Sequence, residues 1–364
     1  MNEQQDEFEF FLDKPWSDGL PVVTPTQSRI SRMLLGTKRD PSEILGPIPP
    51  AMGIASVESV AVHAVMAGCK PEYLPVVLAG TELMLKEEFN VNGVQGTMHG
   101  VAPMMIVNGP YSSQIGIHGG SGCLGPGFRA NASIGRAIRL ILMNLGEGIP
   151  GVSSMTVFGM PSRFTYCLAE NDEDNPWESL AASKGYSPTD DVITMAMVES
   201  PRFCWDDVSN EPERLVRGIA DTMTDMGSWN MHARSDMVVA MSPQHADIFQ
   251  NAGWSRDDVH SSLCEIAGRT VSDLKLGGNW RRERALDLPI TIDPDDDNCF
   301  VPTIKNTVDL QLIVAGGWGP CTAVCHGWSG GSRAVHGKYQ PSLCVPLLSG
   351  AFLDGAFREG KHSR

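Results

Sequence analysis

Long apolar runs are absent from this sequence of 364 residues, and none approaches the roughly 20 residues that a membrane-spanning helix needs. The first residues, MNEQQDEFEFF, are acidic, whereas a signal peptide would begin basic and then turn apolar. From these two absences we expect a cytoplasmic protein that has no membrane partner.

Positive charge is scarce. Lys and Arg together number 28, against 43 Asp and Glu, so the formal net charge is −15. Such a surface repels phosphate backbones, and we therefore expect no nucleic-acid partner. A small anionic ligand stays compatible with this balance, because one Arg and a few backbone N–H groups can reverse the field locally.

Cysteine pairs with metal-site spacing are also lacking. The nine cysteines are scattered and none forms a Cys-x-x-Cys pair, which predicts free thiols in a reducing compartment. The phosphate-binding P-loop is missing, and the glycine-dense segment lacks the preceding strand and the ribose-binding acid of a dinucleotide site. We expect no nucleotide cofactor.

The length predicts two domains, because a single core stops growing at roughly 250–300 residues. We place an N-terminal α/β domain with a Gly-rich loop at 1–200, and a C-terminal α/β domain with a second Gly-rich turn at 205–364. Acid and proline concentrate in 170–212, which we interpret as a connecting region. No internal repeat is evident, so a solenoid is not expected.

Strand and helix patterns alternate along the chain. This alternation predicts an α/β (or α+β) fold with a mixed sheet flanked by helices. The predicted elements are a helix from Ser56 to about Gly68, a helix over 76–89, a strand in APMMIVN, a strand in MVVAM, a helix opened by Ser242-Pro243, a capping box at Ser255 and Asp258, and a strand in VDLQLIV.

A glycine-dense loop, Gly119 to Gly127, is followed by a predicted helix over about 132–145 with Asn131 as its N-cap. Glycine lets backbone approach a ligand, and a helix start offers free N–H groups and a positive dipole. The functional interpretation of this loop is an anion-binding site. The structural interpretation is that its glycines only allow tight turns. The predicted substrate-binding residues are Gly119, Gly120, Asn108, Asn131 and Arg136.

Cys321 follows a strand and a glycine turn in LIVAGGWGPCTAVCHGW, a position that we predict to be the first turn of a helix. A helix start lowers a thiol pKa and favours the nucleophilic thiolate. His326, nearby in sequence, is a candidate acid or base. A buried structural cysteine is the alternative.

Cys69 is a second candidate nucleophile. It follows the end of one predicted helix, which raises a thiol pKa, and precedes Pro71-Glu72, which can open the next helix and lower it. Lys70 would favour the thiolate. His99 and His118, both at predicted turns, are further candidates for moving protons.

A metal site is an alternative use of the same side chains. Zn²⁺ or Fe²⁺ would take ligands from a set of His and Cys residues, namely His99, His118, Cys321, Cys325 and His326. Unrelated histidines are the structural interpretation. The acidic run Glu170, Asp172, Glu173 and Asp174 could supply a carboxylate, although most charge runs are solvated faces.

Five segments carry a resemblance to a known family: AVMAGCKPEYLPVV, IVNGP, RANASIGRAIRL, CLAENDEDNPW and SPQHADIFQNAGWS. Together they resemble a widespread, uncharacterised bacterial family whose members tend to occur beside small UGSC-type proteins with a Sec/Cys-Gly-Ser-Cys motif. The resemblance implies common ancestry and a small protein partner, and it implies no reaction. This chain departs from the family at His99 and His118, where asparagine is expected.

We therefore predict a small-molecule enzyme, a hydrolase or lyase acting on a carboxylate- or amide-bearing compound through a Cys nucleophile and a His acid or base. One alternative is a Zn- or Fe-dependent hydrolase or lyase. Another is a non-catalytic binding or assembly subunit. A homo-oligomer is expected in each case.

Overall fold

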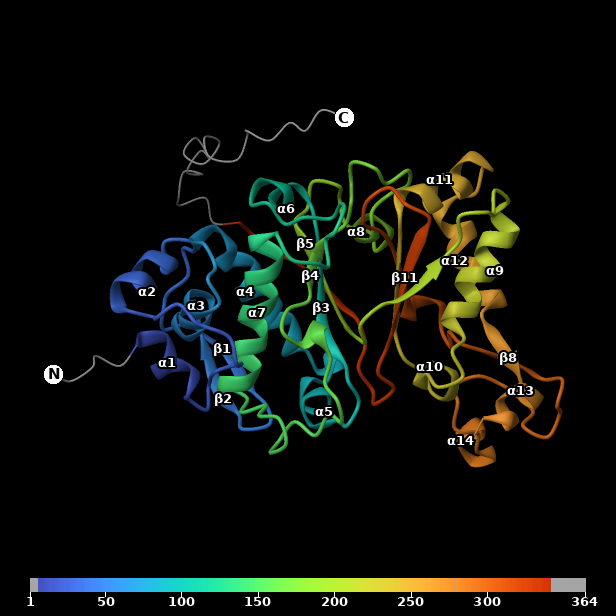
Figure 1. Ribbon diagram of the computed structural model, residues 1–364, viewed down its shortest axis with the longest axis horizontal. Helices are drawn as coiled ribbons and strands as arrows, with labels where there is room; N and C mark the ends of the chain where they lie inside the picture. Colours follow the sequence, from blue (N-terminus) through green and yellow to red (C-terminus); the bar gives the residue numbers. More distant parts are fainter. Residues whose placement is uncertain (1–5, 278, 342–364) are drawn as a thin grey trace.

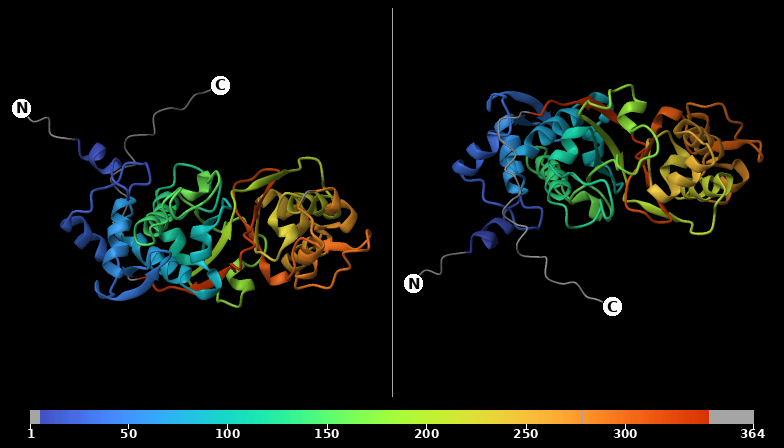
Figure 2. Two further views of the ribbon diagram at one scale, coloured as in Figure 1. Left: turned by 90° about the horizontal axis from the view of Figure 1, so that it is seen from below. Right: turned by 90° about the horizontal axis from the view of Figure 1, so that it is seen from above.

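The computed structural model describes residues 6–277 and 279–341, which form four layers in the order helices, sheet, sheet, helices (Figures 1 and 2). The expected α/β class with helices packed on mixed sheets is confirmed. The described residues do not include 1–5, which form part of the acidic start that argued against a signal peptide. They also do not include Cys344.

The first sheet has the strand order β12-β5-β3-β4. Its strands are β3 (Ala102–Asn108), β4 (Cys167–Ala169), β5 (Val192–Val198) and β12 (Val335–Lys338). The helices of the N-terminal half of the chain and a small hairpin lie on the side of this sheet that faces away from the second sheet. They are α1 (Glu7–Leu12), α2 (Gln27–Leu34), β1 (Ile44–Ile48), β2 (Gly53–Ser56), α3 (Val57–Met66), α4 (Leu74–Met84), α5 (Val91–Gly96), α6 (Pro110–Gln114) and α7 (Arg129–Asn144).

The second sheet has the order β10-β7-β11-β6. Its strands are β6 (Arg202–Trp205), β7 (Met237–Met241), β10 (Leu310–Val314) and β11 (Cys321–His326). The remaining elements are α8 (Leu180–Ser183), α9 (Pro212–Met223), α10 (Trp229–His232), α11 (Pro243–Asn251), α12 (Arg256–Ile266), β8 (Gly268–Thr270), α13 (Val271–Leu276), α14 (Arg282–Leu286) and β9 (Phe300–Pro302).

Alternating side chains of the strands supply three apolar layers. In β3, Met105 and Val107 face the helices of the first half, whereas Met104 and Ile106 face the second sheet. Both sets are buried, because a strand between two layers has no solvent face. The core between the sheets therefore takes apolar side chains from β3, β4 and β5 of the first sheet and from β7, β10 and β11 of the second, together with Tyr166.

The two sheets repeat one arrangement, although the sequence shows no repeat. In each, the central strand has one parallel neighbour (β4 or β10) and one antiparallel neighbour (β5 or β11), which pairs with an antiparallel edge strand. The edge strands are exchanged: β6 follows β5 along the chain but joins the second sheet, and β12 follows β11 but joins the first.

Most of the predicted local elements are confirmed. Ser56 caps α3 through a capping box with Ser59, and Ser255 forms the predicted capping box with Asp258 at α12. The predicted second helix ends earlier, at Met84, and a short 3₁₀ turn follows. The strands in APMMIVN, MVVAM and VDLQLIV are β3, β7 and β10. Among the described residues, no helix combines the length and apolarity that crossing a membrane requires.

Three local predictions are wrong. The segment 170–212 is not a linker, because it contains the fully buried strand β5. Asn131 is not an N-cap, since α7 begins at Arg129 and Phe128 is its N-cap. Cys321 begins strand β11 and not a helix. The two-domain division stays a prediction, and the β5–β6 connection lies at its expected boundary.

Candidate functional site

The two glycine-rich segments meet between the sheets. The N–H of Gly316 donates to the carbonyl of Gly119 at 2.8 Å, and Gly120 and Gly316 form a parallel bridge. Gly317 lies so close to the first loop that an added Cβ would be 2.6 Å from the Cβ of Ser121. Segments about half the chain apart therefore form one continuous backbone surface.

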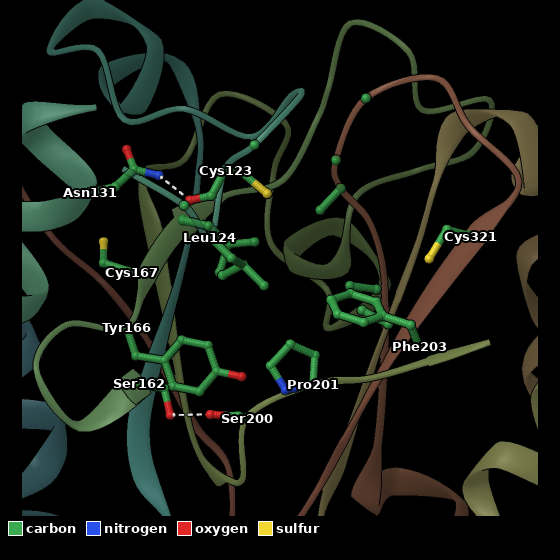
Figure 3. Close-up of a pocket in the computed structure, with 18 of the residues that line it drawn as sticks. Cys123, Leu124, Asn131, Ser162, Tyr166, Cys167, Ser200, Pro201, Phe203 and Cys321 are labelled. Atoms are coloured by element: carbon green, nitrogen blue, oxygen red, sulfur yellow. Dashed lines mark hydrogen bonds between the residues drawn. The ribbon is translucent and has the colours of Figure 1, made fainter. Parts of the chain in front are cut away.

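Beside this junction lies a cavity of about 680 Å³ (Figure 3). Apolar groups dominate its walls, including Leu124, Phe203 and the alanines at the inner face of the second sheet. Its hydroxyl groups come from Ser162, Thr165, Tyr166, Ser200 and Ser242. Among the described residues that line it, none has a charged side chain or an imidazole.

Two thiols face the cavity from opposite walls. Figure 3 shows the sulfur of Cys123 on the glycine-loop side and that of Cys321 on β11. Cys167 also lines the cavity, but its side chain belongs to the core on the helix side of the first sheet. Among the described residues that line the cavity, only Cys123 and Cys321 are therefore placed to touch a bound molecule through sulfur.

Cys123 lies in a tight turn of the glycine loop. Its N–H donates to the carbonyl of Gly120 at 3.0 Å, and the N–H of Gly125 donates to that of Gly122 at 2.7 Å. Burial raises the thiol pKa above its usual value, while the backbone N–H groups of Gly316, Cys123 and Leu124 oppose this by favouring the thiolate. The net pKa is raised, so the neutral thiol predominates.

The structure separates Cys321 from His326. Side chains alternate along β11, so that Cys321 faces the cavity and His326 leaves the opposite face, and five strand residues span roughly 16 Å. Burial raises the pKa of the Cys321 thiol. The two residues cannot act as a nucleophile and its adjacent base.

His326 instead belongs, with His99, to a partly buried polar network in which Arg202 and Glu199 link the two imidazoles. His99 Nε2 lies 2.6 Å from Glu199 Oε1, and Arg202 Nη2 donates to Glu199 Oε2 at 3.0 Å. Arg202 also donates to His326 Nδ1, so the ring nitrogen Nε2 carries the proton and faces the Met223 carbonyl. Burial, with the Arg202 charge, lowers the His326 pKa to about 4. His326 is therefore neutral at pH 7.

His118 and Asn131 hold the glycine loop in shape. His118 Nε2 bonds the carbonyl of Ser121 at 3.0 Å, and its ring stacks on Phe128 with centroids 3.8 Å apart. The Asn131 amide donates to the carbonyls of His118 and Cys123 and accepts from the N–H of His118. Asn131 thus uses its polar atoms on the loop, next to the cavity.

Arg136 and Asn108, two further predicted binding residues, are engaged elsewhere. Arg136 forms a two-pronged ion pair with Asp18 at 2.7 and 2.8 Å. Asn108 Nδ2 donates to Glu170 Oε2 at 2.7 Å, and burial raises the Glu170 pKa to about 7. Glu170, the first residue of the acidic run, is therefore a core residue. It also accepts a hydrogen bond from the N–H of Val314 in β10, and so it joins β3 and β4 to the second sheet.

Cys69 lies in a different pocket from Cys123 and Cys321. Its thiol is buried, interacts with Ser133, and has a pKa that burial raises to about 12. The expected histidine and cysteine metal set is likewise dispersed, with Cys325 bonded to Tyr166 in the core. Within residues 6–277 and 279–341, no group of three or more His, Cys, Asp or Glu side chains could hold a metal ion.

Sequence reasoning did not single out Cys123. The available signal was a cysteine between glycines in GGSGCLGPG, where small neighbours leave room around the sulfur. The segment GWSGG at 327–331 fits the Gly-x-Ser-x-Gly pattern of a nucleophile turn. It forms a loop after β11, however, and no helix follows it as that turn requires.

Comparison with protein-family models, with curated proteins and with solved structures found no match to this chain.

Proposed function

We propose that this protein is a hydrolase that binds a compact, uncharged, amide- or ester-like compound between its two sheets and attacks it with Cys123. The observation that carries the proposal is the placement of the Cys123 sulfur, which faces the cavity from a glycine loop with backbone N–H groups around it. Glycine on both sides of the turn leaves the carbonyl carbon of a substrate free to approach.

The lining of the cavity supports an uncharged substrate. A carboxylate in this apolar space would have no cationic side chain as partner, and burying an unpaired charge is costly. An amide or ester carbonyl needs only hydrogen-bond donors, which the loop N–H groups and the hydroxyls of Ser162, Ser200 and Tyr166 can supply. The volume falls within the range of small-ligand sites.

The proposed chemistry needs one thiolate and one backbone donor. Cys123 loses its proton to solvent, its sulfur forms a bond to the carbonyl carbon, and the Leu124 N–H donates to the developing oxyanion. The leaving group departs with a proton, and water then cleaves the thioester to give a carboxylate and the free thiol. Cys321, across the cavity, contacts the far end of the substrate.

The test uses 4-nitrophenyl butyrate, a small uncharged ester. We expect one equivalent of nitrophenol to be released rapidly, with a butyryl group on Cys123 detected by peptide mass spectrometry. In Cys123→Ser, release falls by at least about a hundredfold. Cys299→Ser is the matched control, because Cys299 is partly exposed and lies outside the cavity lining. Acylation of Cys299 alone, or full release by Cys123→Ser, would refute the proposal.

A non-catalytic binding protein is the second candidate. It is favoured by the raised pKa of both Cys123 and Cys321 and by the absence of imidazole and carboxylate groups among the described lining residues. In that case, the ester analogue 4-nitrophenyl butyl ether would bind reversibly, and no acyl group would appear on either cysteine.

The cytoplasmic location and the homo-oligomer stay predictions. Exposed aromatic side chains beside the cavity support self-association, since Phe203, Trp205 and Trp318 are each about two-thirds exposed. Light scattering coupled to size exclusion tests this, and a monomer at high concentration would contradict it.

A further inference from the structure

A second pocket, of about 410 Å³, lies on the first half of the molecule, away from the cavity described above. It is formed by α2 with its flanking residues, by the end of α3 and the segment that follows it, and by the first residue of α7. Cations dominate its polar side chains, which are Arg29, Arg32, Lys70 and Arg129, with Glu72 as the one carboxylate in the described lining.

This charge is unusual for the chain that carries it. The whole protein has a formal net charge of −15, so a local group of four cations is a strong departure from the surrounding surface. Lys70 lies 3.8 Å from Glu72, but among the described residues Arg29, Arg32 and Arg129 have no carboxylate within 4 Å. Three guanidinium charges therefore face solvent without a counter-charge.

Backbone carbonyls fix two of these guanidinium groups. Arg129 donates through Nε and Nη2 to the carbonyl of Gly68, at 3.1 and 3.0 Å, and Arg29 donates to that of Thr24 at 2.9 Å. A carbonyl orients a guanidinium without neutralising it, and the remaining N–H groups stay available. The cations are thus partly ordered before any ligand arrives, which reduces the entropy lost on binding.

We propose that this pocket binds a small molecule that carries a phosphate group. Arginine donors match phosphate oxygens in pairs, and a dianion with three terminal oxygens can accept from several guanidinium groups at once. A phosphate alone would not fill the pocket, and its apolar lining, Val23, Met33, Leu35 and Val65, suits an attached organic group. The site is independent of the proposed hydrolase.

The second pocket is linked to the glycine loop through Arg129, the first residue of α7, which follows that loop along the chain. The sequence predicts an anion at the start of this helix with Arg136 as the cation, but Asp18 already pairs with Arg136. Arg129, two helical turns before Arg136, is the arginine of α7 whose charge is not paired with a described carboxylate. It follows Cys123 by only six residues. The loop that lines the uncharged cavity therefore leads directly into the helix whose first residue lines the cationic pocket.

The test is calorimetric titration with inorganic phosphate, phenyl phosphate and succinate at low ionic strength. We expect phenyl phosphate to bind more tightly than inorganic phosphate, because the ring covers the apolar wall, and succinate to bind most weakly. Arg32→Gln should weaken phenyl phosphate binding by at least about tenfold, and Arg29→Gln with Arg32→Gln should abolish it. Arg32 is exposed and its side chain makes no hydrogen bond or ion pair among the described residues, so its replacement should not affect folding.

The matched control is Arg217→Gln, which changes the net charge equally at an exposed site on α9 outside the pocket. It should leave affinity unchanged. Three results would each overturn the proposal: no binding of either phosphate compound by the wild type, equal weakening by Arg217→Gln, or retained affinity in the double variant. Cys123→Ser must bind phenyl phosphate normally, so failure of the hydrolase proposal leaves this result unaffected.

Discussion

Among single residues, Cys123 shows how two local effects compete. Burial disfavours the thiolate, and the backbone N–H groups of Gly316, Cys123 and Leu124 favour it. Burial is the larger effect, so the pKa stays above its usual value. This sets the reactivity of the thiol without any nearby base, because no charged group lines the cavity in the described part of the chain.

The pH dependence of alkylation tests this balance. Only the thiolate reacts, so the rate of iodoacetamide labelling at Cys123 should rise about tenfold per pH unit and keep rising beyond the pH at which free glutathione levels off. Free glutathione is the reference compound, since the labelling rate of an unperturbed thiol is half-maximal near pH 8.5 and levels off about one pH unit higher. Peptide mass spectrometry follows Cys123 separately from the other cysteines. A plateau below pH 8 would show that the N–H groups outweigh burial.

At the scale of elements, the packing of α7 against β4 depends on one glycine. A Cβ at Gly135 would lie 2.3 Å from Thr165 Oγ1 and 2.5 Å from the backbone nitrogen of Tyr166. The Thr165 hydroxyl can rotate away only by losing its hydrogen bond to the Asn131 carbonyl, and the Tyr166 nitrogen cannot move without shifting the segment that leads into β4 and the cavity. The helix therefore approaches the sheet as closely as it does because this residue has no side chain.

We expect Gly135→Ala to lower the free energy of unfolding by about 1–3 kcal/mol through overpacking, despite the better helix propensity of alanine. Urea denaturation measures the difference. Gly96→Ala is the matched control, because Gly96 also lies in a helix, α5, and its added Cβ would meet no atom within 4 Å. Equal stability of the two variants would show that α7 can shift at no cost.

Helix starts with a capping serine could be predicted from the sequence, as could the apolar runs of β3, β7 and β10, whereas the buried strands β5 and β11 could not. Ser56 and Ser255 are capping residues whose side chains act within three residues, so the pattern is local. The strands β5 and β11 are buried on both faces, so they lack the alternation of apolar and polar residues that identifies a half-exposed strand. The sequence CTAVCH therefore permits either a helix or a strand.

The site was predictable only in part, for the same reason. The two glycine segments and Cys321 could be selected because glycine and cysteine stand out in composition. Their meeting depends on contacts such as Gly316 with Gly119, which are about two hundred residues apart. No local pattern encodes such a pairing, and none indicated that His326 would point away from Cys321.

For the whole molecule, the exchanged edge strands make each sheet depend on the other half of the chain. β12 pairs with β5 from Val335 opposite Met195 to Lys338 opposite Val192. A chain ending at residue 332 would lose this strand and leave β5 as an unprotected edge. We expect amide exchange in β5 to accelerate strongly in that truncation, although β5 itself is unchanged.

A chain ending at residue 341 is the control for this truncation, because every described contact of β12 is retained. Hydrogen-exchange mass spectrometry on peptides that cover 192–198 compares the two. Protection of β5 that is equal in both truncations would show that β12 contributes nothing to the first sheet.

The exchange of edge strands between the sheets also affects folding during synthesis. A ribosome releases β5 long before β12, so the nascent first sheet waits on the order of ten seconds for its last strand at typical elongation rates. During that interval the edge of β5 is unpaired, and an unpaired strand edge can pair with a neighbouring chain. Only a polypeptide that already includes residues 335–338 can bury this edge.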